Sequence, residues 1–320
     1  MADWQRTSDG RLRAPWRLLV ALVSVVSAGA VASVLAVASG VATPDVATDP
    51  FALVGSQAMV GLAIGAAVVA TARYVDRRPL EAFGLSIDRP WWRDLAAGLA
   101  IGFGLVAVLY LVGVVLGVYT PSLDPNAPDG YTLAAAFVLV ATFVVVVGIY
   151  EELLFRGYLL SNIADGLTAV LGTNQAVLGA VVLSSIGFGL VHGLNPGMTA
   201  LGVATITVAG VALAAGYVLT GRLALPIGFH ITWNLAHFVF GLPVSGIDVG
   251  IRLFATERSG SALVHGGSVG PEGGVLGLAA ALAGCVVVLA YARLARDGPA
   301  IAPTILYAGV ADDRSGPADR

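Results

Sequence analysis

The sequence contains no lysine and only one cysteine, and charged residues of either sign are scarce. Asp, Glu, Lys and Arg together make up 12% of the 320 residues, about half the fraction found in an average soluble protein. With Cys285 alone, neither a disulfide framework nor a metal site built from several cysteines is possible. The net charge of −3 is small and indicates no nucleic-acid partner.

Apolar residues are correspondingly abundant. They make up 57% of the chain, and the mean hydropathy is +0.87. Several runs of about 18 or more apolar residues are typical of membrane-spanning helices. The alternating segments of about ten residues that membrane strands require are not seen. The sequence therefore predicts an all-α polytopic membrane protein, with about eight transmembrane helices in one bundle and no sheet.

The apolar runs divide the chain into three parts. We predict a cytoplasmic tail over 1–17, a transmembrane domain over 18–296 and a disordered tail over 297–320, which is acidic and contains Pro and Gly. A signal peptide is an alternative for the first run, but its apolar core would be shorter. The Gly- and Ser-rich loop 242–273 is predicted to be mobile. The predicted spans are approximately 18–40, 51–72, 95–118, 133–162, 175–194, 199–219, 223–241 and 274–292.

Arginine placement predicts the orientation of these spans. Short cytoplasmic loops are enriched in basic residues. With the amino terminus inside, only Arg252 and Arg258 fall in an outside loop, and Arg156 lies within a span. All other arginines lie in the tails or in inside loops. We therefore predict a multi-pass protein of the cell (plasma) membrane with both termini cytoplasmic.

Strong polar residues inside the spans are concentrated in three of them. A charge at the bilayer centre costs on the order of 3 kcal/mol, so such residues require a cavity or partners. From their places along the helices, we expect these groups to meet within the membrane, below the cytoplasmic face. They are Glu151, Glu152 and Arg156 in the fourth span, His192 in the fifth, and His230 and Asn234 in the seventh.

The two glutamates have different surroundings on the fourth helix. Glu152 precedes Arg156 by four positions, the favourable order for a same-face ion pair. Glu151 is rotated by about 100° from Glu152 and has no counter-ion in its own helix. Such a carboxylate suits a general base. The alternative is that both acids serve one ion-pair network.

The histidines admit two interpretations. His192 follows Phe188 by four residues, and Asn234 follows His230 by four, so each pair shares a helix face. A single membrane histidine usually forms a packing hydrogen bond. Polar groups of catalytic type on three separate helices favour a shared site instead. We interpret His237, further along the seventh span, as a boundary residue.

These motifs, taken in order, resemble those of the CAAX protease and bacteriocin-processing family (Abi, CPBP) of intramembrane peptidases. The matching residues span about 133–241, which the resemblance makes the catalytic core. It implies that Glu151 and His192 activate water, that His230 and Asn234 stabilise the oxyanion, and that Glu152 and Arg156 support the site. The motifs are Glu151-Glu152-x-x-x-Arg156, Phe188-x-x-x-His192 and His230-x-x-x-Asn234.

The resemblance implies an intramembrane endopeptidase that acts on membrane-embedded or lipidated substrates, with the lipid bilayer as its surroundings. Whether the protein requires a metal cofactor is left open by the sequence. Glu151, His192 and His230 could bind a divalent metal such as zinc, but no H-E-x-x-H helix is present, which slightly favours a mechanism that does not require a metal. Two other classes of protein stay open. One is a transporter or proton-linked carrier, because intramembrane acids and histidines also form proton relays. The other is a catalytically silent immunity or adaptor protein.

Overall fold

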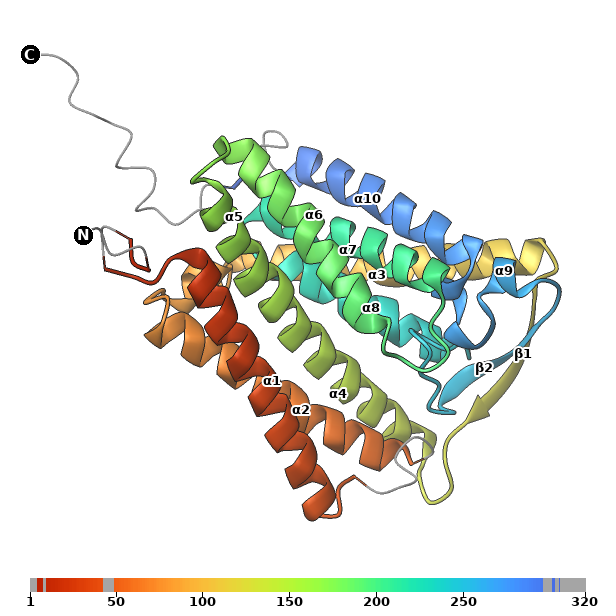
Figure 1. Cartoon of the computed structure of the whole chain (residues 1–320). Helices are drawn as coiled ribbons and strands as arrows, with labels where there is room; N and C mark the ends of the chain where they lie inside the picture. Colours follow the sequence, from red (N-terminus) through yellow and green to blue (C-terminus); the bar gives the residue numbers. More distant parts are fainter. Residues whose placement is uncertain (1–4, 8–9, 43–48, 296–300, 303–304, 306–320) are drawn as a thin grey trace, which may run out of the picture.

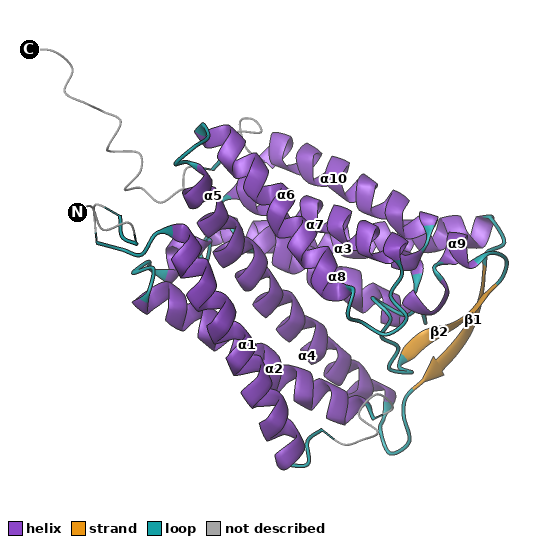
Figure 2. Cartoon of the chain, in the orientation of Figure 1, coloured by secondary structure: helices purple, strands orange, loops and turns teal. Residues whose placement is uncertain are grey.

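The computed structural model describes residues 5–7, 10–42, 49–295, 301–302 and 305, and this part of the chain is a bundle of helices (Figures 1 and 2). The predicted all-α polytopic fold is confirmed. The longer helices are α1 (Ala14–Ala38), α2 (Pro50–Tyr74), α3 (Arg89–Val115), α4 (Leu133–Glu152), α6 (Thr173–His192), α7 (Ala200–Thr220), α8 (Ala224–Val239) and α10 (Val275–Ala295). The shorter ones are η1 (Leu80–Phe83), η2 (Leu153–Leu160), α5 (Ser161–Leu167), α9 (Ala262–His265), η3 (Gly267–Val269) and η4 (Pro271–Gly273).

Seven helices in the described residues are long and apolar enough to cross a membrane. One of them is a continuous helix of 35 residues, Leu133–Leu167, formed by α4, η2 and α5. The remaining predicted span, 223–241, corresponds to α8, which has 16 residues. A helix that crosses the hydrocarbon core needs about 20 residues. The chain is thus a multi-pass membrane protein in which α8 is too short to span the membrane by itself.

Helix α8 lies in the interior of the bundle, where glycines allow it to contact α3 closely. A Cβ atom at Gly98 would collide with the Leu225 carbonyl oxygen, and one at Gly102 with that of Phe229. The Thr232 hydroxyl donates to the Leu99 carbonyl at 2.7 Å, which bonds a side chain of α8 to the backbone of α3. The spacing of Gly98 and Gly102 is the small-residue pattern of closely packed membrane helices. This contact fixes the helix that carries His230 and Asn234.

A two-stranded sheet corrects the prediction of a sheet-free fold. Strand β1 (Tyr119–Asn126) pairs antiparallel with β2 (Arg252–Arg258), and β2 lies in the loop 242–273 that the sequence predicted to be mobile. The Thr256 hydroxyl donates to the Phe240 carbonyl at 2.6 Å and so ties β2 to the end of α8. The strands are far apart in sequence, and Pro121 and Pro125 interrupt the β1 pattern. Sequence periodicity therefore gave no sign of the pair.

The two ends of the bundle differ, and we name them from their residues. The hairpin end contains β1, β2 and the loops 193–199 and 240–273. The arginine end contains the start of α1, the end of α2, the loop 75–88, the turn 221–223 and the end of α10. Helices α1 and α10 have these termini at the same end of the bundle (Figure 1). Helix α8 runs from the arginine end, where the Leu223 N–H donates to the Gly84 carbonyl, to the hairpin end.

The predicted tails are described only in part. Helix α1 begins at Ala14, four residues before the predicted start of the first span. Most of the tail 297–320 lies outside the described residues. Within it, the Ala302 N–H donates to the Val218 carbonyl at 2.9 Å, and the Ile305 side chain is buried.

A buried polar cluster closes the arginine end. Arg17 forms an ion pair with Asp165, and its guanidinium lies 3.9 Å from Asp76. The Asp76 carboxylate accepts hydrogen bonds from the Tyr158 hydroxyl at 3.0 Å and from the Asn162 amide at 2.8 Å. Burial raises the pKa of Asp76, although these hydrogen bonds and Arg17 act in the opposite direction. The cluster ties α1, the segment after α2, η2 and α5 together.

The raised pKa of Asp76 predicts a pH dependence of stability. Because the folded-state pKa lies above the unfolded value, folding favours the protonated acid, and stability falls as pH rises between the two values. We expect the free energy of unfolding of the wild type, relative to Asp76→Asn, to fall as the pH rises above about 4 and then to level off. Thermal unfolding of both proteins in detergent across this range measures the difference. A constant difference would contradict the prediction.

Candidate active site

One cavity brings together the polar residues of three helices. Its volume is about 200 Å³. Glu151 of α4, His192 of α6, and His230 and Asn234 of α8 all line it. The structure therefore places these four predicted residues around one space, although their catalytic roles stay predictions. The remaining lining residues are Gln57, Phe143, Val147, Tyr150, Phe188, Val191, Asn195, Ile206, Ala209, Leu213, Phe229, Trp233, Val244, Ser245, Ile247 and Glu272.

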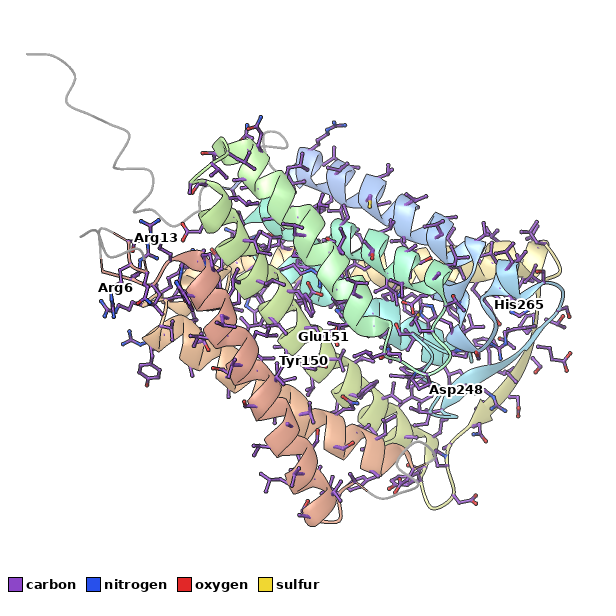
Figure 3. The ribbon with its side chains drawn as sticks, viewed as in Figure 1. Arg6, Arg13, Tyr150, Glu151, Asp248 and His265 are labelled. Atoms are coloured by element: carbon purple, nitrogen blue, oxygen red, sulfur yellow. The ribbon has the colours of Figure 1, made fainter. Side chains whose placement is uncertain are left out.

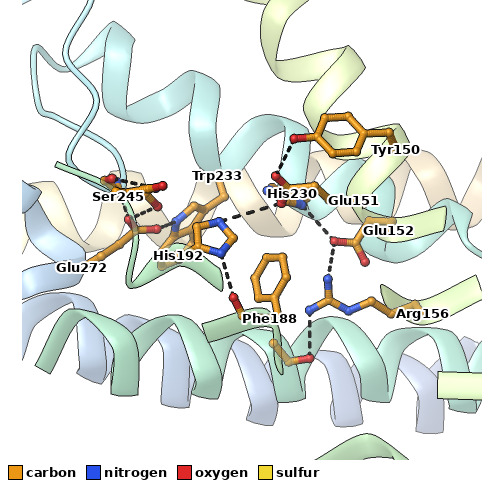
Figure 4. A network of polar contacts seen from close by, with 12 residues as sticks. Tyr150, Glu151, Glu152, Arg156, Phe188, His192, His230, Trp233, Ser245 and Glu272 are labelled. Atoms are coloured by element: carbon orange, nitrogen blue, oxygen red, sulfur yellow. Dashed lines mark hydrogen bonds and ion pairs between the residues drawn. The ribbon is translucent and has the colours of Figure 1, made fainter. Parts of the chain in front are cut away.

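Glu151 faces both histidines across the cavity. Its Oε2 atom lies 3.8 Å from His192 Nε2 and 3.9 Å from His230 Nε2. Both distances are longer than a direct hydrogen bond, and separations of this kind suit a bridging water. Its other oxygen, Oε1, accepts a hydrogen bond from the Tyr150 hydroxyl at 3.1 Å (Figure 4). One oxygen is thus held in place while the other faces the imidazoles.

Glu152 and Arg156 form the buried ion pair that their spacing predicted. Arg156 Nη1 donates to Glu152 Oε1 at 2.8 Å, and both side chains are buried. The same Glu152 oxygen lies 2.8 Å from His230 Nδ1, a contact that the sequence did not indicate. Arg156 also donates to the Gly210 carbonyl at 3.3 Å and lies 4.2 Å from the ring centroid of Phe188. Glu152 therefore orients His230 as well as neutralising Arg156.

The helix changes its winding directly after the two glutamates. Residues Leu153–Leu160 form a π-helix, which follows α4 and continues into α5. π-Helical turns are rare and are often found at functional sites, because the wider winding shifts the direction of the side chains. Arg156 lies in this segment and is buried against Phe188 of the neighbouring helix. No residue pattern in Leu153–Leu160 predicted the change.

The Phe-x-x-x-His motif has a physical explanation in this geometry. The His192 Nδ1 atom lies 2.8 Å from the carbonyl oxygen of Phe188. Because a carbonyl can only accept, the hydrogen bond assigns the proton to Nδ1 and leaves a lone pair on Nε2, towards Glu151. The ring of Phe188 contacts His192 at a centroid distance of 4.5 Å and separates it from Arg156. The Phe188 carbonyl thus fixes the tautomer of His192 with its proton on Nδ1, and the Phe188 ring lies between His192 and the Arg156 guanidinium.

Asn234 lies one helical turn beyond His230. Its side chain is 9% exposed and lines the cavity. Among the residues that the structure describes, none forms a hydrogen bond with the side-chain amide of Asn234. A primary amide in a buried cavity has two N–H donors to offer to a ligand. This geometry suits the oxyanion role that the sequence motif implied for Asn234.

A second polar cluster at the hairpin end of the cavity was missed by sequence analysis. The buried Glu272 of η4 accepts hydrogen bonds from Trp233 Nε1 at 2.8 Å and from the Ser245 hydroxyl at 2.7 Å. The Ser245 N–H also donates to it, at 2.6 Å, and Asn195 donates to the Ser245 carbonyl at 3.0 Å. The cluster joins the loop after α6 to α8 (Figure 4). An acidic residue in a Gly-rich loop was the only available signal.

His237, predicted to be a boundary residue, lies near the end of α8. It is fully buried, and its Nδ1 atom lies 2.7 Å from the Trp233 carbonyl oxygen. It does not line the cavity. Its burial follows from the interior position of α8, where even the last turn is covered by the hairpin end.

The predicted metal ligands do not form a metal site in this structure. Within the described residues, no group of three His, Cys, Asp or Glu side chains is arranged to hold a metal ion. Glu151, His192 and His230 have suitable donor atoms for zinc, but their arrangement gives no support to the predicted site. We therefore derive no chemical step through a metal.

Fold and cavity together define a multi-pass helical membrane protein with an acid–histidine site inside its bundle. Residues 133–236 match the model of the family described as type II CAAX prenyl endopeptidase Rce1-like, so this part of the chain is similar to that family. The family is one of proteases, which supports peptidase activity in general. A comparison with curated proteins found no match, and a comparison with solved structures also found none. The match contains all three polar motifs.

Proposed function

We propose that the protein is an intramembrane endopeptidase that uses Glu151 as its general base. The observation that carries this proposal is the position of the Glu151 carboxylate, 3.8 Å from His192 Nε2 and 3.9 Å from His230 Nε2 within the cavity. Such a space accommodates a water molecule that donates one hydrogen to Glu151 and one to His192. Its oxygen lone pairs then stay free to attack a carbonyl carbon.

The proposed reaction follows from these positions. Glu151 takes a proton from the water as the new C–O bond forms, and it returns this proton to the leaving amine as the C–N bond breaks. The negative charge that develops on the carbonyl oxygen is stabilised by donors from His230 and Asn234. His230 needs a proton on Nε2 for this role, and the nearby carboxylates of Glu151 and Glu152 compensate the resulting positive charge.

The substrates proposed here are peptide segments of membrane-embedded or lipidated proteins. The match to a family described as prenyl endopeptidases supports a lipidated substrate. The site itself supports a membrane-associated one, because it lies inside a bundle of membrane-spanning helices. Apolar cavity residues such as Phe143, Val191 and Ile206 suit apolar groups near the cut bond.

A peptide library in detergent tests the proposal. Wild type and Glu151→Ala are incubated with the library, with and without a chelator, and the products are identified by mass spectrometry. Cleavage by the wild type alone supports the proposal, and the chelator arm reports on a metal. Equal cleavage by both proteins would remove Glu151 as the base. No cleavage by either would favour a carrier or a silent adaptor.

Asn234 offers a separate test of the oxyanion site. In Asn234→Ala, we expect kcat to fall by about 10²- to 10³-fold with little change in KM, because the lost donor acts on the transition state. Steady-state kinetics on a peptide from the library measure both constants, and thermal unfolding checks that the variant is folded. A raised KM with unchanged kcat would instead indicate a role in ground-state binding.

A further inference from the structure

Among the described residues, the loops that border the cavity belong to one end of the bundle. His192 is the last residue of α6, and the chain turns at the hairpin end directly after it. Five lining residues come from loops at this end: Asn195, Val244, Ser245, Ile247 and Glu272. Within the described residues, the loops of the arginine end contribute no lining residue. The cavity is therefore bordered by the loops of the hairpin end, and the expected position below the cytoplasmic face depends on which end faces the cytoplasm.

Packed side chains fill the space between the cavity and the arginine end. Large residues there are almost completely buried, among them Phe83, Tyr158, Leu160, Tyr217 and Leu223. The buried ion-pair cluster of Arg17 and Asp76 lies at the same end. Protein interiors of this kind leave few voids larger than a water molecule. Among the described residues, this packing leaves no open path for water or peptide from the arginine end to Glu151.

The charges of the two ends differ in sign. Within the described residues, the arginine end carries most of the arginines, whereas the hairpin end carries Asp124, Asp248 and Glu257 beside two arginines. One of these two, Arg252, forms an ion pair with Asp124 at 2.8 Å. Figure 3 shows Arg6 and Arg13 at one end, Asp248 and His265 at the other, and Glu151 between them. Basic residues mark the cytoplasmic side of a membrane protein.

We propose that substrates reach the cavity from the hairpin end and that this end faces away from the cytoplasm. The inference rests on the proposed peptidase function and specifies its substrates: peptide segments presented on the extracytoplasmic side of the membrane. Carboxyl-terminal tails that stay in the cytoplasm would not reach Glu151. The three observations behind it are independent, since one concerns the lining of the cavity, one the packing beneath it and one the charge.

Cysteine labelling in sealed vesicles tests which end leads to the cavity. In a Cys285→Ala background, single cysteines are placed at Ser122 on β1, at Ser86 near the arginine end and at Ile247 in the cavity lining. Ser122 and Ser86 are both exposed, which makes them matched reporters. In right-side-out vesicles, a membrane-impermeant maleimide should label Ser122→Cys and Ile247→Cys but not Ser86→Cys. Inverted vesicles should give the opposite pattern. Labelling of Ile247→Cys together with Ser86→Cys would overturn the proposal.

Cleavage in the same vesicles tests the substrate side. A charged, impermeant peptide that the wild type cuts in detergent is added outside the vesicles. We expect cleavage by right-side-out vesicles and its loss in inverted ones, and maleimide on Ile247→Cys should block it. Cleavage by inverted vesicles, alone or equally, would refute extracytoplasmic access while leaving the peptidase function intact. A peptide cut equally by Glu151→Ala in detergent would refute the peptidase function, and the labelling would still report the side of the cavity.

Discussion

Glu151→Gln is expected to lower kcat for peptide hydrolysis by about 10²- to 10⁴-fold, the usual contribution of a general base. Glutamine keeps the size of the side chain and can still accept a hydrogen bond from the Tyr150 hydroxyl, which bonds Glu151 at 3.1 Å. It cannot take a proton from water. The expected effect is therefore on chemistry rather than on folding, and KM should change little. Steady-state kinetics in detergent with one defined peptide measure it.

The matched control for this variant is Glu257→Gln. It makes the same chemical change at the exposed end of strand β2, outside the cavity. Its kcat should equal that of the wild type. A folded Glu151→Gln protein with full turnover would show that another group activates the water. Equal losses in both variants would indicate an effect of total charge instead.

Glu152→Gln is expected to lower the free energy of unfolding by about 3–5 kcal/mol, because it leaves the buried Arg156 guanidinium without a counter-charge. The pair has a distance of 2.8 Å, and both side chains are almost inaccessible to solvent. Reduced folding yield and an earlier transition in thermal unfolding should accompany the loss. A variant with normal yield and stability but lost turnover would assign Glu152 to chemistry rather than to support.

The double variant Glu152→Gln with Arg156→Met separates support of the fold from positioning of His230. Replacing the cation by an apolar side chain of similar length removes the unpaired charge, so most of the lost stability should return. Turnover should not return, since His230 Nδ1 still lacks the carboxylate that lies 2.8 Å from it in the wild type. Recovery of both stability and turnover would show that Glu152 acts only through Arg156.

The helices could be predicted from the sequence because their apolar runs are long and local. The exception, α8, has the composition of a span but only 16 residues, and its burial depends on contacts with α3 that no single helix pattern contains. The ion pair of Glu152 and Arg156 could also be predicted, because residues four apart face each other on a helix. These features depend on separations of a few residues.

Features that join distant segments could not be predicted in the same way. Strands β1 and β2 are separated by more than a hundred residues, and Glu272 meets Trp233 only after the hairpin end has folded. The sequence motifs indicated that Glu151, His192 and His230 share a site, but not that His230 bonds Glu152. The expectation that the site lies below the cytoplasmic face stays a prediction, since it depends on which end of the bundle faces the cytoplasm.

The glycine contacts between α3 and α8 limit how the protein can move. With Gly98 and Gly102 against the backbone of α8, and with Thr232 bonded to Leu99, these two helices cannot slide or separate without losing backbone contact. We therefore expect α3 and α8 to move together, which would hold His230 and Asn234 in place relative to α3. Any widening of the cavity to admit a peptide therefore has to come from its other walls, which are α2, α4, α6, α7 and the loops of the hairpin end.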